Sequence, residues 1–341
     1  TTSKPDAGAA YVYVRDASGS WVEEAQLAAG TGLAYDQIGR AVDLDGDFAI
    51  VAGNGPLQGA PDSFAHNSAV IFERSGGVWA QVANLNPLTD AYTDPFENSF
   101  GAAVAISGST AAVGAPRYAL TGTGFMPGAV FVFERDAAGG WSLATKLQIP
   151  DSEVLGESVA LDGSVLFVGI PGSMSVQVYE RGDGGWSPTA SLSGGAGFGQ
   201  SVAVAGSVAI VGASSEDVGD KLGAGAAYVY ERDETGAWVQ VQRLVAAAPA
   251  DAAYFGQGVA ATPHHLMVGA PGRDRVVLYE RDAQGSWVEA DSFFDPEGDL
   301  GISVAADGAF AAIGAPRPEA VPALEPSSGS VLILEGLRTS D

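Results

Sequence analysis

The sequence predicts an all-β fold, a β-propeller of four-stranded antiparallel blades, on three observations. One pattern of four strand-length runs recurs from end to end of the chain. The runs are rich in Val, Ala, Phe and Tyr, and turn residues bound them. All six tryptophans fall at one position of the pattern. Repetition of this kind indicates sheets that bury their faces against neighbouring copies, so we expect one array rather than separate domains.

The first and second runs define six copies of the pattern. The first run opens with an apolar residue followed by glycine, at Ile38-Gly39, Phe100-Gly101, Leu155-Gly156, Phe198-Gly199, Phe255-Gly256 and Leu300-Gly301. The second run ends near a VGAP motif, whose first position is Val51, Val113, Val168, Val211, Val268 and Ile313. Between the two runs, pairs such as Asp45-Gly46 and Asp162-Gly163 predict tight type I′ turns, because Gly and Asp accept positive φ.

The third and fourth runs complete each copy. The third run ends in Glu-Arg at Glu73-Arg74, Glu134-Arg135, Glu180-Arg181, Glu231-Arg232 and Glu280-Arg281, and Arg15 closes an equivalent run at the amino end. A tryptophan follows each of these arginines by five or six residues, at Trp21, Trp79, Trp141, Trp186, Trp238 and Trp287. We interpret the Glu-Arg pairs as salt bridges on the surface or between blades.

The copies divide the chain into five complete blades and two partial ones within a single domain, 1–341. The complete blades lie at about 38–85, 100–147, 155–192, 198–244 and 255–293. Residues 300–336 lack a fourth strand, and residues 8–27 supply only a third and a fourth. We therefore expect a composite closing blade from both chain ends, since closure removes exposed sheet edges. Six blades are preferred and seven are the alternative.

One third strand is surplus in this scheme. Tyr11 to Arg15 and Val331 to Glu335 compete for one slot of the closing blade. One of them lies on an edge, or a seventh, incomplete blade exists, or the surplus strand pairs with a second molecule. The expected states are accordingly a monomer or a strand-exchanged oligomer, and a structural assembly unit is one candidate function.

Charge and composition exclude several classes of partner. The chain has 16 Lys and Arg against 41 Asp and Glu, a formal net charge of −25. Because phosphate binding depends on Lys and Arg, we expect no nucleic-acid partner. No apolar run is long enough for a membrane helix, so no membrane insertion is expected. The chain opens at Thr1 without a charged-then-apolar leader, and a secretion signal is expected to have been removed or left out.

The connections from second to third strands predict a partner-binding rim. Their lengths range from the short 172–174 to long ones such as 54–67, 117–127 and 317–328. Unequal loops on a regular scaffold are where binding residues gather. The candidates are Phe64, His66, Tyr118, Phe125 and Met126. The alternative is that these apolar groups tuck back over their own blades.

The starts of the first strands predict a channel mouth. The candidate lining residues are Arg40, Glu157, Gln200 and Gln257. A hydrolase that uses this mouth is the competing function. A catalytic site must assemble several groups, however, and this ring offers one acid, one base and no histidine, so a hydrated channel is the expectation. The sequence holds no recognised catalytic motif, so we expect no enzyme and no required cofactor.

These residues resemble FG-GAP repeats, the units of the integrin α-subunit β-propeller and of many bacterial secreted proteins. The resemblance rests on the FG start, the VGAP turn, the YVYER strand and the following Trp, and it covers about residues 8–336. It implies a non-enzymatic extracellular or cell-surface module that binds proteins or glycans. In some members the first hairpin holds calcium.

The calcium feature is where this sequence departs from the resemblance. Only Asp43, Asp45 and Asp47, in VDLDGDF, come close to a calcium loop, which needs six to eight oxygen ligands. This hairpin has no inserted residues, so we expect a structural turn, with a cation site as the alternative. Acids also precede most start motifs, at Asp36, Glu97, Glu153, Asp251 and Asp299, and we expect them to cap turns.

Overall fold

The computed structural model describes residues 8–28, 38–53, 68–85, 99–118, 126–149, 152–295, 298–316 and 330–337. The chain divides into two compact units, Thr1–Val165 and Leu166–Asp341, which are described separately here. The described residues form strands and two short 3-10 helices, with no α-helix among them. In that part of the chain, no helix is long and apolar enough to cross a membrane.

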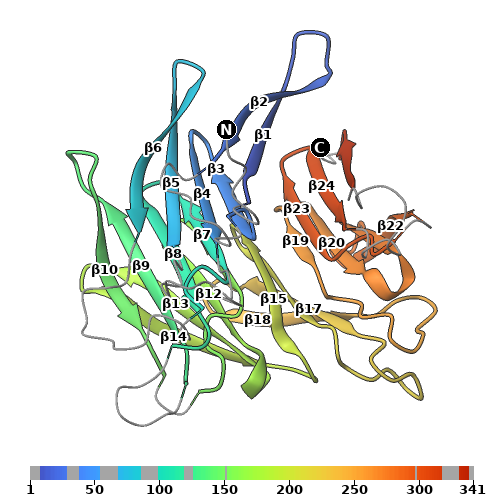
Figure 1. The fold of residues 1–341 in the computed structure, drawn as a ribbon. Helices are drawn as coiled ribbons and strands as arrows, with labels where there is room; N and C mark the ends of the chain where they lie inside the picture. The colour runs from blue at the N-terminus through green and yellow to red at the C-terminus, as the bar shows by residue number, and fades with distance from the viewer. Residues whose placement is uncertain are drawn as a thin grey trace, which may run out of the picture. The chain divides into compact units, whose positions relative to one another are not determined.

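The first unit contains a hairpin, two four-stranded blades and the start of a third (Figure 1). The hairpin is β1 (Ala10–Arg15) and β2 (Trp21–Leu27). The first blade is β3 (Ala41–Asp45), β4 (Phe48–Gly53), β5 (Ser68–Ser75) and β6 (Val78–Leu85). The second is β7 (Val104–Ser107), β8 (Thr110–Ala115), β9 (Ala129–Arg135) and β10 (Trp141–Leu147), and β11 (Val159–Asp162) begins the next.

The second unit continues the same order of strands. The blade begun by β11 contains β12 (Val165–Ile170), β13 (Ser175–Gly182) and β14 (Gly185–Ser193), with helix η1 (Pro171–Ser173). The next is β15 (Phe198–Ala205), β16 (Val208–Ala213), β17 (Ala226–Arg232) and β18 (Trp238–Leu244). Then come β19 (Val259–Ala261), β20 (His265–Ala270), helix η2 (Pro271–Arg273), β21 (Arg275–Arg281) and β22 (Trp287–Phe294). The last sheet is β23 (Ser303–Asp307), β24 (Phe310–Ala315) and β25 (Ser330–Glu335).

Successive blades pack through their first strands. In the first unit β7 lies against both β3 and β11, and in the second unit β19 lies against both β15 and β23. All pairings within the blades are antiparallel between neighbours in sequence. This arrangement confirms the predicted all-β propeller of four-stranded antiparallel blades, and the six start motifs each lead one blade.

The last sheet settles which strand holds the contested third-strand slot. β25 pairs with β24 along six residues, from Phe310↔Glu335 to Ala315↔Ser330. The sheet therefore has three strands, and β1 forms a separate two-stranded sheet with β2. We predicted that the two chain ends join in one blade and that this blade closes a single domain. Both statements are still predictions.

The hairpin turns differ from the prediction by one residue. Asp45 pairs with Phe48, so the two turn residues are Gly46 and Asp47 rather than Asp45 and Gly46. Gly46 has φ +56°, and the equivalent Gly108 has φ +54°. The second central residue, Asp47, does not have a positive φ. A positive φ at the first central residue alone is the pattern of a type II′ turn, which needs glycine there, so the expected type I′ is wrong.

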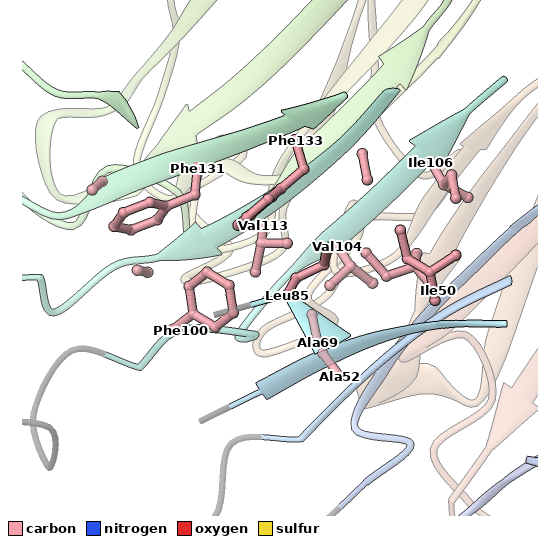
Figure 2. Close-up of a cluster of buried hydrophobic side chains, with 14 of the residues drawn as sticks. Ile50, Ala52, Ala69, Leu85, Phe100, Val104, Ile106, Val113, Phe131 and Phe133 are labelled. Carbon is pink, nitrogen blue, oxygen red and sulfur yellow. The ribbon is translucent and has the colours of Figure 1, made fainter. Parts of the chain in front are cut away.

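The core of the first unit lies between its two complete blades. Phe100, from the second start motif, is fully buried and meets the rings of Phe131 and Phe133 edge to face. Figure 2 shows these rings beside aliphatic side chains from the first blade, including Ile50 and Leu85. The aromatic position of the start motif is therefore a packing position.

The Glu-Arg pairs connect neighbouring blades, as one of the two interpretations predicted. The arginine that ends one third strand binds the glutamate that ends the third strand before it, in Arg135 to Glu73 at 3.2 Å, Arg232 to Glu180, and Arg281 to Glu231 at 2.8 Å. The first blade has a variant, because Arg74 binds Glu24 of the preceding hairpin instead. Each pair is partly exposed, so each contributes at most about 1 kcal/mol.

The tryptophans join the same contacts. Trp79 Nε1 donates to Glu24 at 2.9 Å, and Trp287 Nε1 donates to Glu231 at 3.2 Å. Trp141 packs edge to face on Phe48 of the blade before it. In these three blades the tryptophan near the start of the fourth strand therefore contacts the preceding blade or hairpin, which gives it a structural role.

Candidate functional site

The predicted partner-binding rim is only partly within the described residues. Phe64, His66 and Phe125 lie outside them. Met126 is exposed, with 38% of its surface accessible. Tyr118 is buried, because its ring packs edge to face on Phe131 at 5.4 Å. This tyrosine follows the alternative interpretation, in which the apolar group tucks back over its own blade.

Lys146 also contacts Tyr118. Lys146 Nζ lies 5.0 Å from the centre of the tyrosine ring and donates to its hydroxyl at 3.4 Å. Lys146 belongs to β10 of the same blade, so both contacts hold the ring inward. Among the described residues, Tyr118 is therefore not part of an exposed binding surface.

The four channel-mouth candidates divide between the two units. Arg40 and Glu157 belong to the first unit, and both are exposed. Gln200 and Gln257 belong to the second unit and are half-buried. Gln200 Oε1 accepts a hydrogen bond from Ser214 Oγ at 2.5 Å, so its side chain is engaged by its own blade. Their joint placement around one channel stays a prediction.

The aspartates of the first hairpin bind backbone groups of the next blade. Asp43 Oδ2 accepts from Ile106 N at 2.7 Å, and Asp45 Oδ2 accepts from Gly108 N at 2.6 Å. Asp47 is exposed in the turn, 4.0 Å from Arg74. Among the described residues, no group of three or more His, Cys, Asp or Glu side chains is arranged to hold a metal ion. The hydrogen bonds give Asp43 and Asp45 a structural role between blades.

The carboxyl group of Asp43 has an unusually high pKa because it is buried. Desolvation raises the pKa of its carboxyl to about 6, although the N–H groups of Ile106 and Leu44 favour the charged form. The folded protein therefore holds a proton here between about pH 4 and pH 6 that the unfolded chain has released. The stability that Asp43 contributes is present below about pH 4 and is lost as the pH rises through about 6.

The variant Asp43→Asn should show this linkage as a pH-dependent difference. Between pH 5 and pH 7, its free energy of unfolding should improve relative to wild type by about 1 kcal/mol, since one pKa unit corresponds to about 1.4 kcal/mol before screening. Loss of one acceptor oxygen adds an offset that does not depend on pH. Urea unfolding at several pH values measures the difference.

Asp233 provides the matched control. Hydrogen bonds from Thr235 and Ala237 lower the pKa of this exposed turn carboxyl. Since it stays ionised throughout the range tested, the Asp233→Asn variant should differ from wild type by the same amount at pH 5 and pH 7. A constant difference for Asp43→Asn as well would contradict the assignment.

The best-defined rim loop lies in the second unit. Residues 214–225 connect β16 to β17, and backbone hydrogen bonds close the loop at two levels. Gly225 N donates to Glu216 O at 2.8 Å, and Val218 and Lys221 exchange two bonds of 3.0 and 3.1 Å. Gly223 N also donates to the carboxylate of Asp217 at 2.7 Å. The loop therefore has a fixed shape of its own.

Glu216 anchors this loop to its blade. Its Oε1 accepts from Arg243 Nε at 3.0 Å, and its Oε2 accepts from the Tyr228 hydroxyl at 2.8 Å. Burial is the main cause that raises the pKa of Tyr228. The glutamate side chain is only 14% exposed, so its charge is enclosed by the two partners that satisfy it. Glu216 therefore has a structural role, and the exposed side chains of this loop belong to other residues.

A second segment holds the tip of the loop from outside. Leu222 N donates to Asp251 Oδ1 at 2.9 Å, and Leu222 O accepts from Ala252 N at 2.8 Å. Tyr254 N donates to Gly223 O at 3.1 Å. Asp251 therefore caps a neighbouring loop through a backbone N–H, which agrees with the role predicted for this acid; Asp36 and Glu97 lie outside the described residues.

These contacts present two apolar side chains to solvent. Leu222 is 68% exposed and Tyr254 is 42% exposed. The Tyr254 ring lies beside Gly223, with Cε1 3.7 Å from the point that a Cβ of residue 223 would occupy. We call Lys221, Leu222, Asp251 and Tyr254 the rim surface. Lys221 and Leu222 lie on the predicted kind of connection, whereas Asp251 and Tyr254 lie on the connection from β18 to β19. Neither segment contains any of the five predicted residues.

The backbone of Tyr254 follows from the repeat. Its φ of +54° lies in the left-handed region, and the residue before the start motif has the same conformation at Ser99, Val154 and Asp299. The conformation is unfavourable for a bulky residue and costs on the order of 1 kcal/mol. The backbone conformation at this position is therefore common to the repeats. The tyrosine side chain is what distinguishes this copy.

Comparisons with known proteins agree with the fold and the repeat. The profile of the FG-GAP repeat matches residues 21–63, 79–133, 192–230 and 238–286, together more than half of the chain. The chain is thus a β-propeller built from repeats that contact their neighbours. It belongs to the FG-GAP repeat family. The comparison with curated proteins found no match.

Solved structures share the architecture at low identity. A protein from Lactobacillus plantarum is 18% identical with a TM-score of 0.61, over 96% of this chain and 93% of that one. The periplasmic gluconolactonase of Pseudomonas aeruginosa is 15% identical with a TM-score of 0.53, over 96% and 95%. Sqt1 of Saccharomyces cerevisiae is 10% identical with a TM-score of 0.52, over 91% and 75%. At these identities the likeness concerns the fold alone.

Proposed function

We propose that this chain is a non-enzymatic extracellular binding module and that the rim surface contacts a protein partner. The observation that carries the proposal is the pair Leu222 and Tyr254, held exposed on a loop that hydrogen bonds fix in place. Rigid, exposed apolar and aromatic side chains lose little conformational entropy on binding and form the energetic centres of protein interfaces. The extracellular location rests on the resemblance to integrin-type and secreted repeats.

The surrounding charges indicate the character of the partner. Asp251 lies beside the apolar pair, and Asp220 is almost fully exposed, with 88% of its side chain accessible. The chain as a whole carries a net charge of −25. A partner surface with an apolar centre and a basic border would therefore associate faster and with better complementarity than an acidic one. No cofactor is part of the proposal.

The variants Leu222→Ser and Tyr254→Ser test the proposed surface. Binding to a panel of purified secreted and cell-surface proteins, measured by surface plasmon resonance, should identify a partner whose affinity falls at least tenfold in each variant. The affinity should also fall with added salt, because the acidic border contributes to association. Thermal unfolding should change little, since both side chains are exposed.

A matched pair of variants controls for the loss of an exposed apolar group. Val239 and Val241 on β18 are 46% and 48% exposed, and they lie on a fourth strand rather than on the rim. Val239→Ser and Val241→Ser should retain the affinity of the wild type. Equal loss in the rim and β18 variants would contradict the proposed surface. Binding on a glycan array that the rim variants abolish would assign the same surface to a carbohydrate instead.

An enzyme remains the second candidate function, because a propeller of similar fold is a gluconolactonase by name. A channel-mouth hydrolase would depend on Arg40 and Glu157, both of which are exposed in the first unit. Assays of the wild type against lactone, ester and glycoside panels should show no turnover. Turnover that the Glu157→Gln variant abolishes would replace the binding proposal.

A further inference from the structure

We propose that Glu216, Tyr228 and Arg243 are positioning residues of the rim surface, which hold the 214–225 connection in the shape that presents Leu222. We call these three residues the loop bracket. The proposal rests on the proposed function, because it concerns how the same surface is formed. Two observations carry it: the contacts of the bracket itself, and an equivalent bracket of different chemistry in another blade.

The loop bracket closes around the carboxylate of Glu216 from two strands. Its Oε2 accepts from the Tyr228 hydroxyl on β17 at 2.8 Å, and its Oε1 accepts from Arg243 Nε on β18 at 3.0 Å. The Arg243 guanidinium also lies 5.9 Å from the centre of the Tyr228 ring. Hydrogen bonds to a charged group are stronger than neutral ones. The bracket therefore fixes the first turn of the loop on two strands of its blade.

Backbone hydrogen bonds connect the bracket to both ends of the loop. Glu216 N donates to Ala213 O at 3.1 Å, and Glu216 O accepts from Gly225 N at 2.8 Å. Residue 216 is thus joined to the last residue of β16 and to the residue before β17. Leu222 lies between these two ends, so its direction depends on where residue 216 is held.

The blade β7–β10 contains the same bracket with other residue types. The equivalent residues, counted from the VGAP motif, the closing arginine and the tryptophan, are Tyr118 for Glu216, Phe131 for Tyr228 and Lys146 for Arg243. The rings of Tyr118 and Phe131 meet edge to face, and Lys146 contacts both the ring and the hydroxyl of Tyr118. A cation and an aromatic ring therefore hold the first position in both blades.

The backbone bonds of the two brackets also correspond. Tyr118 N donates to Ala115 O at 3.0 Å, and Gly128 N donates to Tyr118 O at 3.1 Å. These are the equivalents of the two bonds made by Glu216. Since the geometry is kept while the side chains differ, the position is what holds the loop, and the three residues act as a set.

The three positions hold other residue types where the connection is short. In the blades β11–β14 and β19–β22, a single 3-10 turn joins the second strand to the third. No aromatic residue stands among the equivalent residues, which are Ser173, Gln177 and Ser191 in one blade and Arg273, Val277 and Ser292 in the other. In these four blades the bracket therefore accompanies a long connection.

Gly195 leaves room for the bracket from the opposite side. It lies on the connection from β14 to β15, and a Cβ at this residue would be 2.1 Å from Glu216 Oε2 and 2.3 Å from Glu216 Cδ. An alanine here would therefore push the carboxylate away from its partners, while every group of the bracket stays in the chain. Gly195→Ala thus changes the position of Glu216 without changing its chemistry.

Hydrogen exchange of the full chain, followed by mass spectrometry, tests the bracket without a partner. The amides of 217–225 should exchange about tenfold faster in Gly195→Ala, Glu216→Ala and Tyr228→Phe, since each variant breaks a hydrogen bond to a charged group. The amides of the strands of the same blade should keep the exchange rates of the wild type.

Tyr230→Phe is the matched control for Tyr228→Phe. Both rings pack edge to face on Phe198, but Tyr230 lies outside the bracket, so its variant should leave the loop unchanged. The triple variant Glu216→Tyr, Tyr228→Phe, Arg243→Lys copies the set of the blade β7–β10. It should exchange more slowly in the loop than Glu216→Ala does, because a complete set is restored.

Binding then tests the positioning role. For a partner found with the panel above, Gly195→Ala should lower the affinity about tenfold, because the loop presents Leu222 for a smaller share of the time. Faster loop exchange with unchanged affinity would overturn this role. Equal exchange in Gly195→Ala, Glu216→Ala and the wild type would overturn the bracket, as would faster exchange throughout the blade. A panel in which no protein binds the wild type would count against the proposed function, whereas faster exchange confined to the loop would still support the bracket.

Discussion

Replacing Gly212 with alanine is expected to destabilise the protein by about 3 kcal/mol, the cost of forcing an extra group into a packed interior. A Cβ at residue 212 would lie 2.0 Å from the carbonyl oxygen of Gly256 in the next blade and 2.3 Å from Ser201 Oγ. Ser201 Oγ itself donates to that carbonyl at 2.8 Å, so the backbone of the next blade is held in place. Relief would require the two blades to separate, and urea unfolding measures the cost.

Gly184 supplies the control for this substitution. Nothing lies within 4 Å of the position that its Cβ would take, and its φ is not in the left-handed region. Gly184→Ala should change stability by less than about 1 kcal/mol. Similar costs for Gly184→Ala and Gly212→Ala would show that the glycine of the VGAP motif is not a point of close approach. The same contact recurs at Gly114 and Gly269, at 2.1 and 2.0 Å, so the effect should recur there.

Trp287→Ala is expected to have the second large effect, a loss of about 3–5 kcal/mol. The indole is 2% exposed, and the Arg281 guanidinium lies 4.4 Å from the centre of its ring. Its Nε1 donates to Glu231 of the preceding blade, which also binds Arg281. Removing the ring leaves a cavity between blades and uncovers a charge pair. The midpoint of urea unfolding should fall accordingly.

The neighbouring Val288 separates this contact from a general effect on β22. It is 42% exposed and lies on the same strand. Val288→Ala should cost less than about 1 kcal/mol. The more conservative Trp287→Phe should recover part of the loss, since it restores ring packing but not the hydrogen bond to Glu231. A cost for Trp287→Ala no greater than that for Val288→Ala would refute the role of the tryptophan between blades.

The repeat made most of the fold predictable from sequence. Each blade is defined by residues whose roles are local, such as Gly46 in a tight turn, or are repeated between neighbours, such as Glu231 with Arg281. A repeat that contacts mainly its neighbours multiplies each signal by the number of copies. The Glu-Arg interpretation succeeded for this reason. The predicted turn positions were wrong by one residue, because either Asp-Gly or Gly-Asp can form the two-residue loop.

The candidate site was less predictable, because it depends on what differs between copies. Tyr118 was chosen as an exposed aromatic, but packing on Phe131 and Lys146 buries it. Leu222 and Tyr254 were missed, although Tyr254 directly precedes a start motif and the loop before it is long. Their exposure follows from backbone hydrogen bonds between segments about thirty residues apart, and such contacts leave no mark in a local pattern.

An alanine scan of residues 198–294 tests the central claim most directly. Both stability and partner binding are measured for every single variant. The account predicts two separate sets of residues. Positions fixed by the repeat, among them Phe198, Glu231 and Trp287, should lose stability. Leu222 and Tyr254 should lose binding and keep the stability of the wild type. If every loss of binding instead followed a loss of stability, or if Leu222 and Tyr254 affected neither, the rim surface would not be the functional site of this propeller.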